Sequence, residues 1–184
     1  MIQLAEIPGL SPSLFTVAGR RVRPLGDADA PALQRLFDRC GDYFDLLEGR
    51  PAGPEAAWDE LRDGPPGRVP HDLFALGIDG GQGEFAGYIG ALRHHRRPDQ
   101  WYLGFLLLDP AWRGRGLGSI AYWAFQHWVQ TQGANSLLLA VIAENERGHR
   151  FWQSLGFGSP RGYPARQIGL KRHVLIEYEK TLMQ

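Results

Sequence analysis

Hydrophobic residues along this chain recur with two different periods, and the two periods separate helices from strands. Apolar side chains spaced three and four positions apart run through 117–129 and predict a helix. The same spacing predicts a helix over 30–40, and a shorter one that begins at Pro54. Continuous apolar runs at 101–108 and 136–143 are instead typical of buried strands.

The segments between these elements predict further strands and one more helix. We expect strands at 13–18, 20–25, 72–79, 84–92 and 173–180, and a helix from about Asn145 to Leu155. Such an order predicts an α/β (α+β) fold, in which helices flank a mixed and mostly antiparallel sheet. A chain of 184 residues fits one domain, 1–184, in which 1–12 form a loose lead-in.

Composition excludes several classes of partner. The 20 Lys and Arg residues balance the 20 Asp and Glu residues, so no overall charge attracts nucleic acid or an anionic membrane. Cys40 is the only cysteine, which excludes an internal disulfide and a cysteine-based zinc site, and we expect no metal. No apolar run approaches the ~20 residues that cross a bilayer, and the first residues lack a basic start typical of signal peptides. We therefore expect a cytoplasmic protein.

The stretch "DPAWRGRGLGS" (109–119) places three glycines and two arginines between a predicted strand and a predicted helix. Amides in the first turn of a helix have no partner within the helix, and the helix dipole is positive there. Glycines let a ligand approach that backbone, and arginines add charged donors, so the stretch suits a phosphate or pyrophosphate. A plain turn with solvated arginines is the alternative. The candidate binding residues are Arg113, Gly114, Arg115, Gly116, Leu117, Gly118 and Ser119.

Two familiar nucleotide-binding loops fit this stretch poorly. A Walker A loop requires a lysine after its second glycine, and no lysine is nearby. A dinucleotide-binding loop directly follows the first strand of a parallel sheet, with glycines spaced G-x-G-x-x-G. Here Gly114 and Gly116 match, but Ser119 replaces the third glycine and five residues separate the strand from the loop.

A different family matches better, because a second motif follows at 145–157. The first stretch fits Arg/Gln-x-x-Gly-x-Gly/Ala, and "NERGHRFWQSLGF" fits Asn-x-x-Ala/Gly-x-x-Phe/Leu-aromatic-x-x-x-Gly-Phe. The matching residues are Arg113, Gly116 and Gly118, with Pro110 before them, and Asn145, Gly148, Phe151, Trp152, Gly156 and Phe157. Two motifs in the right order, each at a strand-to-helix junction, are much more specific than one. The chain resembles the GNAT superfamily of N-acetyltransferases, most strongly over 101–157.

The resemblance implies acetyl-CoA as the donor and direct transfer of its acetyl group to an amine in a ternary complex. It also implies a central strand pair that splays at a bulge, which Gly104 would ease. The freed amides of Phe105, Leu106 and Leu108 would then bond the pantetheine arm. The Leu106 and Leu108 amides would also stabilise the oxyanion that forms on the thioester.

Three residues of the second motif complete the predicted coenzyme site. Asn145 either bonds the pantetheine arm or caps its helix, and it can do both. Phe151 and Trp152 would flank the arm, although they also have the spacing of core residues. Many members of the superfamily carry a tyrosine, the proton donor to the leaving thiolate, where this chain has Trp152. The indole N–H is far too weak an acid for that step, so the general acid stays open.

The general base is also open. Among the candidates for the base, we nominate Tyr102 and Glu84. The stretch "RHHRRPDQ" (93–100) also contains histidines, but its pattern first predicts a solvated turn. The acceptor is expected across the splayed strands, under a loop at 41–53. This loop interleaves acidic and aromatic residues, which suits an amine with an apolar body, although a helix with its acids in water is the alternative. The candidate acceptor-binding residues are Asp42, Tyr43, Asp45 and Glu48.

The expected partner is a small-molecule or peptide amine, and the sequence is compatible with a homodimer without setting the oligomeric state. Two other functions are compatible with the same sequence features. Trp152 makes a CoA-sensing binding protein without turnover credible. A dinucleotide-dependent oxidoreductase would instead be stabilised by NAD(P) and not by CoA.

Overall fold

The computed structural model describes residues 13–62 and 72–182 of the 184-residue chain. The predicted lead-in at 1–12 lies outside the described residues. Eight strands form one sheet in the order β1-β2-β3-β4-β5-β6-β8-β7. All neighbours pair antiparallel except β5 and β6, so the mixed, mostly antiparallel sheet predicted from the sequence is confirmed. The strands are β1 (Phe15–Val17), β2 (Arg20–Pro24), β3 (Leu73–Gly81), β4 (Glu84–Leu92), β5 (Gln100–Leu108), β6 (Ser136–Ile142), β7 (Gly158–Ile168) and β8 (Lys171–Thr181).

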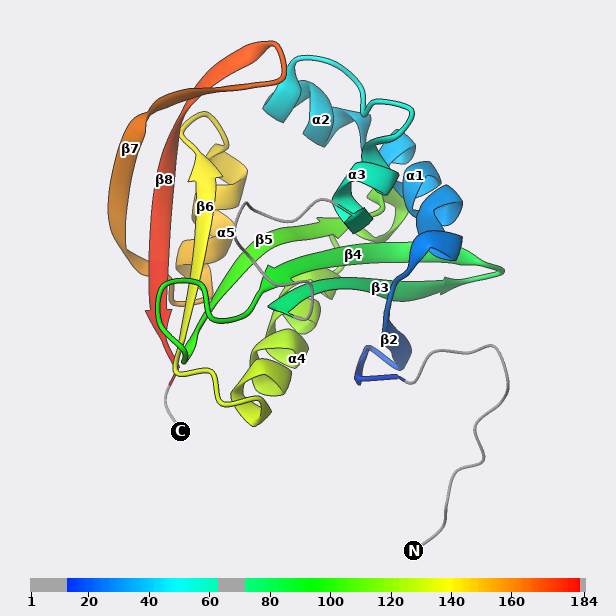
Figure 1. The fold of residues 1–184 in the computed structure, drawn as a ribbon, viewed down its shortest axis with the longest axis horizontal. Helices are drawn as coiled ribbons and strands as arrows, with labels where there is room; N and C mark the ends of the chain where they lie inside the picture. The colour runs from blue at the N-terminus through cyan, green and yellow to red at the C-terminus, as the bar shows by residue number, and fades with distance from the viewer. Residues whose placement is uncertain (1–12, 63–71, 183–184) are drawn as a thin grey trace, which may run out of the picture.

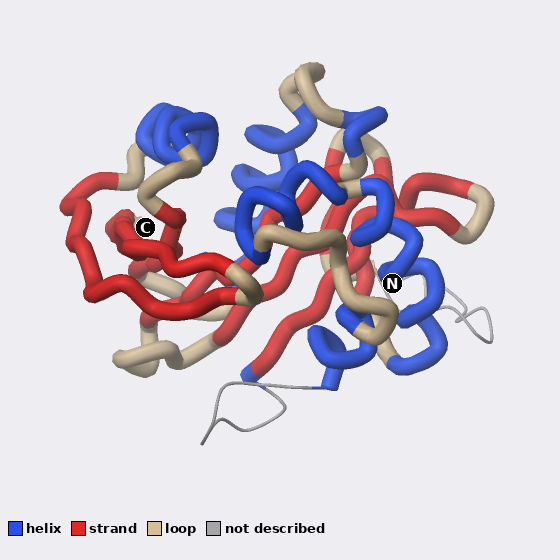
Figure 2. The backbone as a smooth tube through the Cα atoms, turned by 90° about the horizontal axis from the view of Figure 1, so that it is seen from above, coloured by secondary structure: helices blue, strands red, loops and turns tan. Residues whose placement is uncertain are grey.

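Helices cover both faces of this sheet (Figures 1 and 2). They are α1 (Ala30–Arg39), α2 (Gly41–Glu48), α3 (Ala56–Arg62), α4 (Leu117–Thr131) and α5 (Glu146–Ser154), with short 3-10 turns at Asp27–Asp29 and Pro110–Trp112. α1, α2 and α3 pack on one face around Phe37 and Tyr88. α4 packs on the other face, where Phe125 and Val129 are fully buried.

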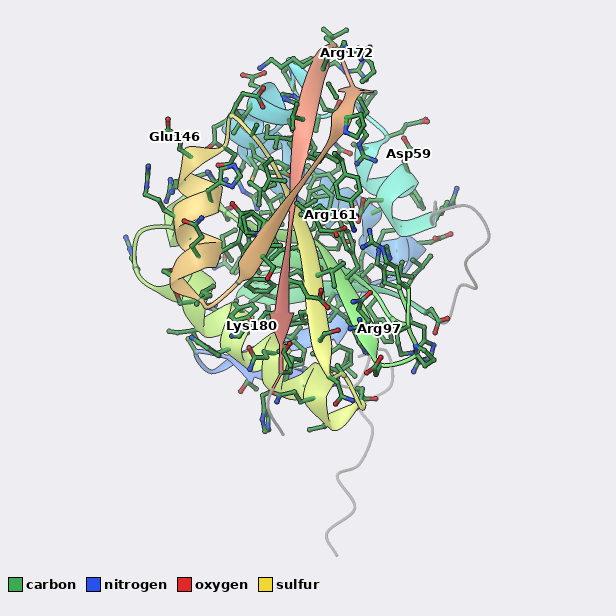
Figure 3. The ribbon with its side chains drawn as sticks, turned by 90° about the vertical axis from the view of Figure 1, so that its left-hand side faces the viewer. Asp59, Arg97, Glu146, Arg161, Arg172 and Lys180 are labelled. Atoms are coloured by element: carbon green, nitrogen blue, oxygen red, sulfur yellow. The ribbon has the colours of Figure 1, made fainter. Side chains whose placement is uncertain are left out.

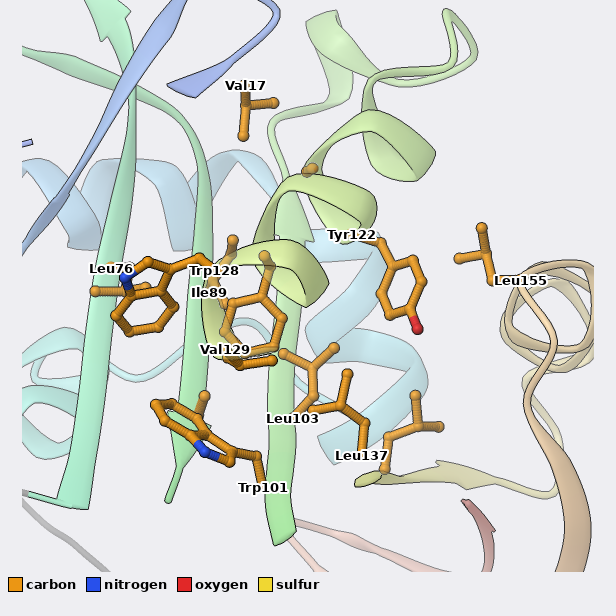
Figure 4. Close-up of a cluster of buried hydrophobic side chains, with 14 of the residues drawn as sticks. Val17, Leu76, Ile89, Trp101, Leu103, Tyr122, Trp128, Val129, Leu137 and Leu155 are labelled. Carbon is orange, nitrogen blue, oxygen red and sulfur yellow. The ribbon is translucent and has the colours of Figure 1, made fainter. Parts of the chain in front are cut away.

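The larger hydrophobic cluster lies between α4 and the centre of the sheet (Figure 4). Trp101 of β5 is 1% exposed and meets the ring of Trp128 edge-on, with 5.5 Å between ring centroids. Tyr122, which lies on α4 together with Trp128, is fully buried. Burying side chains of this size contributes roughly 1.5–3 kcal/mol each, so the cluster fixes the angle at which α4 leaves the glycine-rich turn.

The central strands β5 and β6 separate soon after they meet. They pair only where 100–102 lies beside 136–138, and beyond these residues each strand continues without the other. Figure 1 shows β5 and β6 diverging from this short contact. The splayed strand pair expected from the sequence is therefore present, and it leaves backbone groups of both strands without a partner strand.

A bulge at Gly104 changes the face on which the residues of β5 lie. Leu103 pairs with Ala91 and Phe105 pairs with Gly90, so Gly104 is the extra residue. Before the bulge Leu103 packs in the α4 cluster, whereas after it Phe105 packs in the cluster under α1 and α2. Tyr102 and Phe105, three positions apart, consequently lie on the same face of the sheet.

The sequence prediction of a loop at 41–53 is wrong for its first half, because Gly41–Glu48 forms α2. Cys40 ends α1 and begins α2, and no side-chain cap marks the junction. What stabilises α2 is contact with distant parts of the chain. Phe44 is 3% exposed and packs on Phe37 with 5.2 Å between ring centroids.

The β7–β8 pair closes the far edge of the sheet (Figure 3). Lys180 of β8 ties this edge to the helices, because its Nζ donates to Leu155 O at 2.7 Å and to Gln126 Oε1 at 2.8 Å. At the other end of the pair, the amide of Leu170 donates to Glu48 O at 2.7 Å. None of the helices in the described residues has the length and apolar composition needed to cross a membrane.

Candidate functional site

A cavity of about 980 Å³ opens where β5 and β6 separate. Its walls come from both splayed strands, from the glycine-rich turn before α4, and from α2 and α5. Because most predicted coenzyme residues line it, we call it the coenzyme cavity. These lining residues are Leu106, Leu108, Arg113, Gly114, Gly116, Gly118, Ser119, Asn145, Phe151 and Trp152. Arg115 and Leu117 belong to the same turn without lining the cavity.

The glycine-rich turn presents unused amides to this cavity. Gly114 and Gly116 have φ angles of 73° and 78°, in the left-handed region that favours glycine. The amide of Ile120 is the first in α4 to bond back, to Gly116 O at 3.2 Å. Among the described residues, the amides of 114–119 have no acceptor within the protein. This is the arrangement that binds an anion at a helix N-terminus.

Arg113 braces the turn from behind. Its Nε donates to Leu108 O at 2.7 Å and its Nη1 donates to Asp42 at 2.5 Å. Its Nη2 is buried without a hydrogen-bond partner among the described residues, on the side of the Cys40 thiol. The guanidinium group therefore joins the end of β5 to α2, and it holds the turn in place whatever further contact it makes with a ligand.

Asn145 caps α5, as one of its two predicted roles requires. Its Oδ1 accepts a hydrogen bond from the amide of Gly148 at 2.8 Å. A Cβ at Gly148 would lie 2.7 Å from Asn145 Nδ2, so a larger residue here would make the capping side chain shift. The Nδ2 group makes no hydrogen bond to another described residue, and Asn145 lines the coenzyme cavity. Capping thus leaves its N–H donors available for a ligand.

The register between β4 and β5 decides which amides of β5 face the gap. The amide of Asp109 donates to Ala86 O at 3.0 Å, which marks a hydrogen-bonded pair. Because the amides of an antiparallel strand alternate between its two edges, those of Leu106 and Leu108 point away from β4, toward the gap. By the same alternation the amide of Phe105 points toward β4. Its predicted contact with the pantetheine arm is therefore wrong.

Aromatic side chains form the wall opposite these amides. Phe151 and Trp152 of α5 line the cavity with 4.8 Å between their ring centroids. Trp152 also meets Tyr122 and Phe157 edge-on, at centroid distances of 5.7 and 5.5 Å. Trp152 is thus part of the packing between α5 and α4, and it presents an apolar surface to the cavity.

A second cavity of about 1640 Å³ is lined by residues of β3, β4, β5 and α3, together with residues of β7 and β8. We call it the acceptor-side cavity. It meets the coenzyme cavity at residues that line both: Tyr102, Gly104, Phe105, Ala140, Arg166 and Leu175. The two cavities therefore adjoin at β5 and β6, beside the bulge.

The sequence model of the acetyltransferase (GNAT) family matches residues 31–157, which is more than half of the chain. The matched region includes the turn before α4 and all of α5. The chain belongs to the GNAT acetyltransferase family. No curated protein sequence matches this GNAT chain.

Solved structures of other acetyltransferases share the fold. An acetyltransferase from Thermus thermophilus is 25% identical, with a TM-score of 0.71 over 93% of this chain and 100% of that one. The ribosomal-protein-S18-alanine N-acetyltransferase from Escherichia coli is 17% identical, with a TM-score of 0.64 over 90% of this chain and 95% of that one. Ard1 from Thermoplasma volcanium is 18% identical, with a TM-score of 0.62 over 90% of this chain and 99% of that one.

The two nominated bases of this GNAT chain lie in different places. Glu84 lines neither cavity, and ion pairs with Arg35 at 2.7 Å and Arg39 at 3.0 Å hold its pKa below the usual value. Its nomination is corrected, because a paired surface carboxylate is a poor base and has no substrate to act on. Tyr102 lines both cavities, but burial raises its pKa. A neutral phenol suits a proton donor better than a base.

The four residues predicted to bind the acceptor all lie on α2. Asp42 and Tyr43 line the coenzyme cavity, and Asp42 is paired with Arg113 of the glycine-rich turn. Asp45 and Glu48 line neither cavity. Because α2 packs on the same face of the sheet as α3, the acceptor role of these four residues stays a prediction.

An acidic residue that the sequence did not single out does line the acceptor-side cavity. Glu60 of α3 is partly buried there, and its Oε1 accepts a hydrogen bond from Tyr88 OH at 2.8 Å. Burial raises the pKa of Glu60, and the hydrogen bond from Tyr88 lowers it. One signal was available in the sequence. Glu60 follows the fully buried Ala57 by three residues, which places the carboxylate on the inner face of the helix.

Proposed function

We propose that this protein is an acetyl-CoA-dependent N-acetyltransferase that moves an acetyl group directly to a primary amine in a ternary complex. One observation carries the proposal. Two cavities share lining residues on β5 and β6, where these strands separate. A donor in one cavity and an acceptor in the other can touch only there, which is the arrangement that direct transfer requires.

The residues of the coenzyme cavity fit coenzyme A chemically. The amides of 114–119 offer donors to a pyrophosphate, and Asn145 Nδ2 and the Leu106 and Leu108 amides offer donors along an amide-containing arm. Phe151 and Trp152 supply an apolar wall. Acetyl-CoA supplies the acetyl group as a reactive thioester. The Leu106 and Leu108 amides, already oriented toward the gap, would stabilise negative charge on the thioester oxygen by about 3 kcal/mol each.

The chemistry of Cys40 supports direct transfer over a covalent acyl-enzyme. Cys40 is the only cysteine in the chain and is 0% exposed. Its thiol lies 3.5 Å from Leu108 O and lines neither cavity. Burial raises the pKa of this thiol, which disfavours the nucleophilic thiolate.

Tyr102 is our candidate for the proton donor that Trp152 cannot be. It lies at the end of the short β5–β6 contact, where both cavities meet. Burial raises the pKa of its hydroxyl, so the phenol stays protonated at neutral pH. A protonated group at the gap can give its proton to the leaving thiolate.

The acceptor is a primary amine on a small molecule or on a peptide. The acceptor-side cavity, about 1640 Å³, is large enough for either. The similar structure from Escherichia coli is that of a ribosomal-protein-S18-alanine N-acetyltransferase. Peptide amines therefore belong in an acceptor screen for this protein.

The direct test is thiol release from acetyl-CoA in the presence of a panel of amines and peptide N-termini. We expect release that depends on the amine, and an N-acetylated product by mass spectrometry. Protein that is stabilised by acetyl-CoA but acetylates no amine would favour the CoA-sensing alternative. That alternative stands because Trp152 replaces the tyrosine that donates a proton in many members of the superfamily. Stabilisation by NAD(P) and not by CoA would overturn the assignment of the coenzyme cavity.

A further inference from the structure

The acceptor-side cavity contains a carboxylate that no described cation neutralises. Glu60 forms no ion pair with another described residue, and its one hydrogen bond comes from the uncharged hydroxyl of Tyr88. A partly buried carboxylate without a cation is costly, since burial removes water from the charge. Such a group in a ligand cavity is a candidate for binding a charge that the ligand brings.

The other charges of this cavity are largely satisfied by the protein. Three of the four arginines that line it among the described residues have carboxylate partners: Arg62 with Asp27 at 2.9 Å, Arg93 with Asp72 at 3.0 Å and Arg96 with Glu177 at 2.7 Å. The fourth, Arg166 of β7, acts electrostatically on Tyr102 and has no effect on the pKa of Glu60. The charge of Glu60 is therefore left for a ligand.

Glu60 also lies against β4, the strand that neighbours β5. A Cβ at Gly90 would lie 3.0 Å from Glu60 Oε1 and 3.2 Å from Tyr88 OH, so the absence of a side chain at Gly90 makes room for the carboxylate. Gly90 pairs with Phe105, next to the bulge at Gly104. The carboxylate thus lines a cavity that shares Tyr102, Gly104 and Phe105 with the coenzyme cavity.

We propose that Glu60 binds the ammonium group of the acceptor and takes its proton before acetyl transfer. This rests on the proposed function and names the substrate class as a cationic primary amine, whose body lies against the aromatic wall of Tyr88, Tyr102 and Phe105. The first proton passes from the ammonium nitrogen to Glu60 and then to solvent. The nitrogen lone pair then forms the C–N bond, and the C–S bond breaks. The nitrogen loses its second proton and the coenzyme sulfur gains one, so the products are an amide and the thiol of coenzyme A.

The surroundings of Glu60 suit this role. Burial raises its pKa, which makes the carboxylate a stronger base, while the hydrogen bond from Tyr88 limits the rise. The titratable groups that face it are Tyr88 of β4 and Tyr43 of α2, and burial raises the pKa of both phenols. Both phenols are therefore neutral when Glu60 titrates, and neither supplies a competing charge.

The test compares Glu60→Gln with Asp59→Asn, in the intact protein. Gln keeps the shape and one acceptor for Tyr88 but cannot take a proton. Asp59 is the neighbouring residue on α3, is exposed, and lines neither cavity (Figure 3). We expect Glu60→Gln to lower kcat/KM for the best amine by about 100-fold or more, as loss of a general base does, and Asp59→Asn to match wild type. Both variants should keep the wild-type stabilisation by acetyl-CoA, which reports folding and coenzyme binding.

A second variant separates a proton acceptor from a structural carboxylate. Tyr88→Phe removes the hydrogen bond that lowers the pKa of Glu60, so the acidic limb of the kcat/KM profile should move to higher pH. Activity of Glu60→Gln within threefold of wild type, or an unmoved acidic limb in Tyr88→Phe, would overturn the role of Glu60 and leave the acetyltransferase proposal standing. Wild-type protein that binds acetyl-CoA but acetylates no amine would overturn both.

Discussion

Gly116→Ala tests whether the turn before α4 binds the coenzyme through its backbone. Gly116 has a φ of 78° and borders the coenzyme cavity, with no atom within 4 Å of a Cβ placed on it. Alanine in this left-handed conformation costs about 1–2 kcal/mol. Either its methyl group projects from the turn, or the backbone relaxes and turns the amides of 114–119 away from their present direction. Both outcomes should weaken coenzyme binding.

The matched control is Gly133→Ala, at the other end of the same helix. Gly133 has a φ of 86°, has equally open surroundings and lines neither cavity. The two variants should lose similar stability, because the backbone strain of about 1–2 kcal/mol is the same in both. For a chain of this size each kcal/mol lowers Tm by about 2–4 °C.

Thermal unfolding with and without acetyl-CoA separates the two effects. At a concentration about 100 times the wild-type Kd, the coenzyme stabilises the folded state by about 2.7 kcal/mol, or roughly 5–11 °C in Tm. Loss of one or two hydrogen bonds to charged phosphate, at about 1.5–3 kcal/mol each, weakens binding about 100-fold. Gly116→Ala should then keep only about 0.4 kcal/mol of that stabilisation, whereas Gly133→Ala keeps all of it. Equal stabilisation of the two variants by acetyl-CoA would refute the backbone cradle.

Substitutions at Tyr102, Glu60, Arg113 and Asp42 test other parts of the site. Tyr102→Phe should lower kcat by about 10- to 100-fold with an unchanged Kd for acetyl-CoA, as stopped-flow and binding measurements would show; an unchanged kcat would remove Tyr102 as the proton donor. Glu60→Gln should raise Tm at neutral pH by about 2–4 °C, equivalent to about 1 kcal/mol. Because burial raises the folded-state pKa of Glu60, its ionisation destabilises the fold, so this gain should be absent below the usual carboxyl pKa and appear as the pH rises above it; a gain independent of pH would contradict the assigned charge. Arg113→Ala should lower the free energy of unfolding by about 2 kcal/mol in a urea titration, because it removes the hydrogen bond to Leu108 O. Asp42→Ala should lower it by less than about 1 kcal/mol, since that carboxylate is 63% exposed. Equal losses in the two variants would show that the ion pair, and not the backbone contact, braces the turn.

The coenzyme side could be predicted from the sequence because its determinants are local. A strand, a glycine-rich turn and a helix follow one another within 101–129, and each has its own pattern. Gly116 and Gly148 are favoured for reasons within a few residues: a positive φ at Gly116 and the space for the cap of Asn145 at Gly148. Gly104 was likewise expected at a bulge, and the register shift is there.

The acceptor side depends on contacts between residues far apart in the chain, so the sequence did not reveal it. α2 lacks a side-chain cap and is stabilised by the packing of Phe44 on Phe37, so its interleaved acids resembled a binding loop. The surroundings of Glu60 are formed by Tyr88 and Gly90, which are 28 and 30 positions away in the chain. Only the folded chain places this carboxylate against Tyr88 and Gly90, in a cavity that also includes Tyr102 and Phe105.

The central claim is that donor and acceptor meet in the gap between β5 and β6, and initial-rate kinetics test it most directly. Acetyl-CoA and the best amine would be varied together, and reciprocal rates plotted against reciprocal amine concentration. Direct transfer in a ternary complex predicts a family of lines that intersect. Parallel lines, together with an acetylated protein detected by mass spectrometry in the absence of amine, would contradict the claim and point to a covalent acyl-enzyme.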